Sequence, residues 1–465
     1  MAPSPRIQKL QPIRSPVGVV DVWYMIIDIL CDVKEEDQDE CKSLTKSPLY
    51  LRDLISLSST CKLLRGLLAP RIFAVVYLHN TAKSALSIKA IANGHFSGCI
   101  KELRYVANCR LDQQNSPVED VYPPEVDTVL SNLAALKGLQ TLSIEFPFDY
   151  DELMEHVQDS DFHEDPQAAV IEEGKNAWRG LMAASFRAIL SSYSPQRCPG
   201  GQVLVSLTIH ALNIVPISVF STREFHEFLS HLERFRMSLK QWDNGVGWML
   251  NTQEVFFNFP NSLGPWFFNH LTSVEEFSFD PQDSAPLGNS GQPYAYDISL
   301  WNATMPRLRK LTLGNIYLCL ELKDFLLRHL DTLESIFLQE CYSCREWEGG
   351  EGMSWSELFS ALAQKSPTRL TSFSLHWDYD EGDLLDLDDD MADPTLVAHV
   401  QRMLEIEPDA RVFPCCYCHV SDKYGYASHD WDANRAAFLQ GDDYRSYQDL
   451  MAIVNANATG NHHNA

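Results

Sequence analysis

The sequence has little positive charge. Its 465 residues include 37 Lys and Arg against 63 Asp and Glu, which gives a formal net charge of -26 at pH 7. The sequence contains no cluster of Lys and Arg to offset this excess. Phosphate backbones and anionic membrane surfaces repel such a chain. We therefore expect neither a nucleic acid nor a membrane as a partner.

The sequence also lacks a long hydrophobic run at its start. The opening residues, "MAPSPRIQKLQPIRSP", are proline-rich and basic, so they resemble neither a signal peptide nor a transmembrane segment. We expect disordered tails over residues 1–16 and 451–465. Without a secretory signal, the twelve cysteines are expected to be reduced thiols. The expected compartment is the cytoplasm, the nucleus or both.

Glycine-rich phosphate loops and catalytic signatures are missing as well. The patterns GxGxxG, GxxxxGK[ST], GxSxG and HExxH do not occur, and no kinase-like signature is found. We therefore expect a protein that is not an enzyme, with no catalytic residue and no cofactor.

What the sequence does contain near its start is amphipathic. The stretch "DLISLSSTCKLLRGLLAPRIF", residues 53–73, has large side chains at a spacing of three or four: Leu54, Leu57, Cys61, Leu64 and Leu67/Leu68. This spacing predicts one helix of roughly fifteen residues that begins near Asp53 and is stopped by Pro70. The helix is too short to span a bilayer.

A second apolar stripe lies in "GVVDVWYMIIDIL", residues 18–30. The segment between the two stripes is acidic and polar, and we expect it to be an exposed loop. Two short amphipathic helices make a poor core by themselves, so both are expected to dock onto the rest of the chain or onto a partner.

From about residue 100 a short apolar motif recurs. The copies are "IKELRY" at 100, "LQTLSI" at 139, "LVSLTI" at 204, "LERFRM" at 232, "VEEFSF" at 274, "LRKLTL" at 308, "LESIFL" at 333 and "LTSFSL" at 370. The second half of each copy alternates apolar and polar residues, which predicts a strand with one buried face. In the second copy the alternation is carried by Leu142 and Ile144.

Helical spacing appears between the copies. It is present in 221–232, 320–330 and 354–366, and residues 168–194 are expected to form one long helix. Alternating strands and helices with a recurring motif predict an α/β fold, an irregular leucine-rich-repeat solenoid whose parallel strands line the concave face with helices outside. A doubly wound α/β fold is the alternative, and the missing phosphate loop disfavours it.

Together these parts resemble fungal F-box proteins with irregular leucine-rich repeats. An F-box-like helical domain over 17–75 is supported by "GVVDVWYMIIDIL" and by the stretch 53–73, which resembles the family's second and third helices, including Thr60-Cys61 and the run Ala69–Phe73. A leucine-rich-repeat-like domain over 76–450 is supported by "FLLRHLDTLESIFLQECYS" and "AFLQGDDYRSYQDLM". The chain departs from the family in having Val19 for Pro, Asp21 for Glu and a long loop over 31–50.

The resemblance implies the substrate-recognition subunit of an SCF-type cullin–RING E3 ubiquitin ligase. The F-box would dock a Skp-type adaptor, and the repeats would hold an unknown protein substrate. The implied adaptor-binding residues are Val22, Trp23, Ile26, Ile27, Leu30, Leu54, Leu57, Cys61 and Leu64. The alternative is a leucine-rich interaction scaffold outside the ubiquitin pathway, whose F-box-like helices cap the first repeat; Val19 and the long loop favour it.

A substrate is expected to bind where the alternating strand residues point out of the concave face. These residues are Arg104, Ser143, Thr208, His210, Arg236, Ser278, Thr312, Phe337, Gln339, Ser374 and His376. Among them, Phe337 is a large aromatic that would anchor a ligand if it is exposed; the alternative is that a loop covers it. Only Arg104 and Arg236 are arginines, so a phosphate-reading site is not expected.

Two further motifs suggest metal ions. Cys341, Cys344 and the group Cys415, Cys416, Cys418 and His419 offer zinc ligands, but their spacing is irregular and Cys341 fits the repeat motif. The acidic segment 377–394 has its glycine one position early for a calcium loop and no closing glutamate, so a solvated loop is expected. We therefore expect no metal site; a zinc-dependent protein that uses the C-terminal cysteines is the third hypothesis, which metal analysis of the purified protein would test.

Overall fold

The computed structural model describes residues 49–108, 121–147, 166–193, 204–240, 246–283, 285–344, 352–378, 394–406 and 415–462. Its centre is a parallel sheet of nine strands that neighbour one another in chain order. The strands are β1 (Val75–His79), β2 (Glu102–Val106), β3 (Thr141–Glu145), β4 (Ser206–Leu212), β5 (Arg234–Leu239), β6 (Glu276–Asp280), β7 (Lys310–Gly314), β8 (Ser335–Gln339) and β9 (Ser372–His376). Every predicted strand is present, and β1 is an additional one.

Alternation along the strands gives the sheet one apolar face. Two rows of side chains point to the helices: Val76, Leu103, Leu142, Leu207, Phe235, Phe277, Leu311, Ile336 and Phe373, and then Leu78, Tyr105, Ile144, Ile209, Met237, Phe279, Leu313, Leu338 and Leu375. Because no single strand–helix unit can bury such a row, the units stack into one continuous core.

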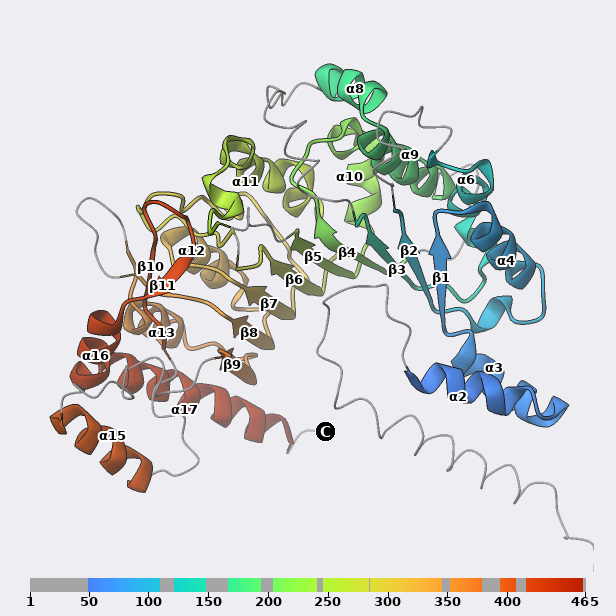
Figure 1. Ribbon diagram of the computed structural model, residues 1–465. Helices are drawn as coiled ribbons and strands as arrows, with labels where there is room; N and C mark the ends of the chain where they lie inside the picture. The colour runs from blue at the N-terminus through green and yellow to red at the C-terminus, as the bar shows by residue number, and fades with distance from the viewer. Residues whose placement is uncertain are drawn as a thin grey trace, which may run out of the picture.

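Helices cover the outer side of the sheet, and the strands lie on the inner side of an arc (Figure 1). The connections carry α4 (Ala82–Ala92), α6 (Pro124–Leu130), α8 (Pro166–Lys175), α9 (Ala177–Ser192), α10 (Arg223–Ser230), α11 (Glu254–Trp266), α12 (Leu320–His329) and α13 (Trp355–Gln364). The α/β solenoid-like architecture agrees with the predicted fold class. Thr81, Thr222 and Ser354 begin their helices with side chains that accept a backbone N–H.

One expected helix is divided into two. Residues 168–194 were expected to be continuous, but α8 ends at Lys175 and α9 begins at Ala177, with Asn176 in an extended conformation between them. The buried face then continues through α9, where Trp178, Phe186 and Ile189 join the core. Apolar spacing alone does not reveal a break that lasts one residue.

Apolar spacing predicts one helix over residues 53–69, whereas the family resemblance implies two. The structure has two helices, α2 (Leu49–Ser58) and α3 (Lys62–Ile72). Asp53 lies inside α2 instead of at its start. Pro70 lies inside α3, which ends two residues later. Cys61 caps α3 through its sulfur, which accepts the Leu64 N–H and thereby fixes the break.

The C-terminal part closes one end of the sheet. It contains α15 (Pro394–Ile406), the antiparallel pair β10 (Cys418–Val420) and β11 (Ala427–His429), α16 (Trp431–Gln440) and α17 (Asp442–His462). Gly441 separates the last two helices with a φ of 70°, a conformation that favours glycine. Residues 451–462 continue α17, so the expected disordered tail is helical there. The Asn457 amide of α17 bonds the backbone of Pro367 and Leu370, just before β9.

Several expectations lie outside the described residues. These are the tail over 1–16, the helix expected over 18–30, most of the loop over 31–50, and the acidic segment from 379 to 393. Within the described residues, the eight cysteines are free thiols. No described helix is both long and apolar enough to cross a membrane.

Candidate binding face, helix pair and cysteine cluster

Eight of the predicted face residues form one row across the sheet. Strand pairing places Tyr77 opposite Arg104 and then continues, strand by strand, through Ser143, Thr208, Arg236, Ser278, Thr312, Phe337 and Ser374. His210, Gln339 and His376 lie two residues further along their strands. The sequence thus identified which residues share the face, although Tyr77 was missed with its strand.

These side chains differ in exposure. Arg236 and Gln339 are exposed and most others are half-buried, but Ser143 is only 3% exposed. Its hydroxyl donates to the Glu102 carboxylate at 2.9 Å, and the Arg104 guanidinium bonds the same carboxylate at 2.7 Å. Arg104 also donates to the Tyr77 hydroxyl at 3.2 Å. Ser143 therefore helps to orient the charged pair and offers little surface to a ligand.

The first five strands carry charges of both signs on this face. Arg104 is paired with Glu102, and the buried Glu145 lies directly opposite His210. Arg104 and Arg236 flank His210, which is partly buried on β4. Burial, followed by the two guanidinium charges, lowers the pKa of His210 to about 4. The imidazole is therefore neutral near pH 7 and can donate or accept a hydrogen bond.

Acidic groups that the sequence did not identify lie at the ends of β6 and β8. The Asn315 amide donates to Asp280 at 3.0 Å, and the Tyr342 hydroxyl lies 3.4 Å from both Asn315 and Glu340. Burial raises the pKa of Asp280 and of Glu340. Asn315 and Glu340 both follow a strand with positive φ, and this turn position is the signal that could have indicated them.

Phe337 lies on β8, within the second part of the sheet. Its ring is half-buried and stacks near the His376 ring, with centroids 6.4 Å apart. The ring is thus neither fully exposed nor fully covered, and its role as an anchor stays a prediction. The face as a whole combines charges of both signs, neutral hydrogen-bonding groups and an aromatic ring.

The helix pair α2–α3 has a small apolar cluster of its own. Leu54, Leu64 and Leu68 are buried against one another, with Leu57 and Ile72 packed beside them. Of the predicted adaptor-binding residues, Leu54 and Leu64 are thus internal, Leu57 is half-buried and Cys61 is exposed. The pair instead presents Ile55 and Leu63, which are 49% and 51% exposed. Val22, Trp23, Ile26, Ile27 and Leu30 lie outside the described residues.

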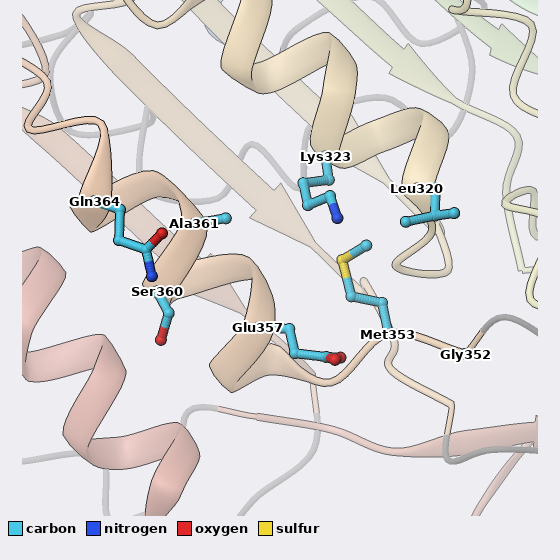
Figure 2. A pocket seen from close by; sticks show the side chains of 8 residues that line it. All are labelled: Leu320, Lys323, Gly352, Met353, Glu357, Ser360, Ala361 and Gln364. Atoms are coloured by element: carbon cyan, nitrogen blue, oxygen red, sulfur yellow. The ribbon is translucent and has the colours of Figure 1, made fainter.

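A pocket of about 470 Å³ lies on the helical side of the sheet, between α12 and α13. Figure 2 shows Lys323 and Met353 reaching into the space between the two helices, with Glu357 at its edge. Only Lys323 and Glu357 among the lining residues carry charge. The rest of the lining is apolar or neutral and polar, and includes the Ser360 hydroxyl and the Gln364 amide.

The cysteine motifs are separated by the fold. Cys341 bonds the Leu313 carbonyl within the repeats, and His419 is exposed. Cys416 and Cys418 instead meet His429, a residue that the sequence did not suggest. Hydrogen bonding from Cys418, aided by His429, lowers the pKa of the Cys416 thiol to about 7.

No protein-family model matches the chain, and no curated protein matches it either.

Proposed function

We propose that this protein is the substrate-recognition subunit of an SCF-type cullin–RING E3 ubiquitin ligase. The N-terminal helices bind a Skp-type adaptor, and the inner face of the sheet binds the substrate protein. The chain itself performs no catalysis. It raises the effective concentration of substrate lysines near a ubiquitin-charged enzyme, in the cytoplasm or the nucleus.

The observation that carries the proposal is the separate core of the helix pair. Leu54, Leu64 and Leu68 pack within α2–α3 and are not part of the core of the sheet and its helices. A module with its own core can hold a partner while the sheet holds another. Its exposed Ile55 and Leu63 supply the apolar surface that a helical partner needs.

Co-purification of the full chain with a Skp-type adaptor tests the proposal. Ile55→Asp and Leu63→Asp place a carboxylate where an apolar interface would bury it, which costs several kcal/mol. Both side chains are exposed in the unbound chain, so the variants should keep its circular dichroism spectrum. Leu86→Asp is the matched control, because Leu86 is 54% exposed on α4.

Adaptor binding by the intact chain and by Leu86→Asp, together with its loss in either folded helix-pair variant, would support the proposal. If the intact chain does not bind the adaptor, the ubiquitin assignment fails.

The alternative is an interaction scaffold whose helix pair caps the first repeat. One contact favours it: Phe73, at the end of α3, stacks on Phe96 beyond α4 with ring centroids 4.9 Å apart. A cap stabilises the repeats that it covers. If the helix pair is a cap, Phe73→Ala should therefore lower the melting temperature of the chain. The measurement that distinguishes the two hypotheses is adaptor binding, which the scaffold would not show.

A further inference from the structure

The hairpin β10–β11 brings three metal-ligating side chains together near the end of the sheet. Cys416 and Cys418 are two residues apart on one extended segment, so their side chains point the same way. Cys418 pairs directly with His429 across the hairpin. The ligand atoms of all three lie within 4.8 Å of one another, and both cysteines are buried.

We propose that Cys416, Cys418 and His429 bind a structural zinc ion, with Cys344 as the fourth ligand. Two thiolates bound at about 2.3 Å to a tetrahedral zinc lie about 3.8 Å apart. The Cys416 and Cys418 sulfur atoms are separated by 3.6 Å. The thiols are thus already close to the spacing that zinc requires, and a ligand set of sulfur and imidazole nitrogen is one that zinc prefers.

Cys344 is brought to this site by backbone pairing. The Ser343 N–H donates to the Cys416 carbonyl at 2.8 Å, and the Cys418 N–H donates to the Ser343 carbonyl at 2.9 Å. The next residue, Cys344, therefore lies beside Cys418 in the backbone pairing. Its sulfur is not among the atoms that lie within 4.8 Å of one another, so its side chain would have to turn towards the ion to serve as the fourth ligand. Its sulfur accepts a hydrogen bond from the buried amide of Gln292, whose oxygen in turn accepts the Val420 N–H at 2.5 Å.

A second observation points to the same site. The Tyr317 hydroxyl is fully buried and has no hydrogen-bond partner among the described residues. It interacts electrostatically with Cys418, Cys344 and Cys416. Thiolates on zinc are strong acceptors, so an ion there would give this hydroxyl an acceptor and would make Tyr317 and Gln292 outer groups that orient the ligands.

With four protein ligands the site is closed, which is typical of a structural ion and not of a catalytic one. The ion would join the hairpin, which carries three ligands, to the segment that follows β8. It would thereby fasten the C-terminal part of the chain onto the repeats, independently of any adaptor or substrate.

Metal analysis of the purified full chain, produced with a histidine-free tag and without chelator, tests the proposal. We expect about one zinc ion per chain, the stoichiometry of a single closed site. Cys416→Ser, Cys418→Ser and His429→Ala should each lose the zinc. Cys415→Ser and His419→Ala are the matched controls: both are next to a proposed ligand but outside the cluster, and both should keep the zinc.

Cobalt loading gives a readout that does not depend on whether variants fold. The intact chain, stripped of metal and titrated with Co²⁺, should show sulfur-to-cobalt charge transfer and the strong visible bands of a tetrahedral site. Intact protein that holds no zinc and shows no such bands would overturn the proposal. A folded Cys416→Ser that keeps its zinc would overturn it too. A Cys344→Ser variant with an unchanged cobalt spectrum would refute the fourth ligand.

Discussion

Glu321 should be the carboxylate on which the stability of the β6–β7 connection depends most. This connection, residues 281–309, contains no α-helix among its described residues, and α12 of the following repeat holds it in place. The Glu321 carboxylate is 2% exposed and accepts the N–H groups of Ile298 at 2.8 Å, Leu300 at 2.5 Å and Trp301 at 2.9 Å. At the other end of α12, His329 accepts the Met305 N–H at 3.0 Å.

The size of the effect follows from which N–H groups can reach water. The N–H groups of Ile298 and Leu300 are buried, whereas that of Trp301 is only partly buried. Each buried donor left without an acceptor costs about 1–3 kcal/mol. Glu321→Ala should therefore lower the free energy of unfolding by about 2–6 kcal/mol. Glu321→Gln can retain the bonds of one oxygen, to Leu300 and Trp301, and should cost only about 1–3 kcal/mol.

Urea unfolding followed by tryptophan fluorescence measures these differences, and hydrogen exchange at Ile298 and Leu300 localises them. Glu227→Ala is the control, because its ion pair with Arg223 is exposed; it should change stability by no more than about 0.5 kcal/mol. The reasoning would be refuted if Glu321→Ala cost less than about 1 kcal/mol or if the Gln and Ala variants were equally unstable.

Two further outcomes are expected. The pKa of His210 is lowered to about 4 in the folded chain. Between this pH and about 6.5, His210 is therefore protonated in the unfolded chain and neutral in the folded chain. Stability should therefore fall as the pH drops from about 6.5 towards 4. His210→Asn should flatten that part of a stability–pH curve, and an unchanged curve would contradict this account. Gly425→Ala should cost about 1–3 kcal/mol, because Gly425 has a φ of 80° and a Cβ there would lie 2.2 Å from the Asn251 side chain. Gly66→Ala is the control, with open space around its Cβ inside α3. It should gain about 0.5–1 kcal/mol in thermal unfolding, and a loss equal to that of Gly425→Ala would rule out the steric explanation.

The strands were predictable because each carries its own signal. In copies such as Phe277 and Phe279, or Leu311 and Leu313, buried residues alternate with polar ones, and parallel stacking then fixes the row of side chains on the other face. β1 was missed although "FAVVYL", residues 73–78, fits the motif with Phe73, Val76 and Leu78, because Phe73 had been assigned to the end of the preceding helical stretch. The breaks at Asn176 and at Ser59–Cys61 do not show in the apolar spacing, which continues across them; only the family resemblance implied the second break.

The contacts between distant segments were not predictable in the same way. Nothing in the sequence near Cys416 points to His429, since their pairing depends on the hairpin register. His419 was the natural choice from spacing, but alternation turns it to the opposite face from Cys418. Likewise, Glu321 looks like any charged residue at a helix start until the β6–β7 connection is placed against it. Local sequence patterns thus predict helices and strands, whereas side-chain contacts between distant segments depend on how the sheet is assembled.

The row of inner-face residues from Tyr77 to Ser374 stays in register across all nine strands, although the β4–β5 pairing shifts beyond Ile209. Residues 146–205 between β3 and β4 include two helices, while residues 213–233 between β4 and β5 include one α-helix, yet Ser143, Thr208 and Arg236 remain direct neighbours. Neighbouring positions in the row stay about 4.8 Å apart whatever the length of the outer connections. Segments can therefore be inserted or exchanged on the helical side without moving the inner row. An engineer could alter what the inner face recognises by changing single residues in that row, and could separately graft a new function onto a connection.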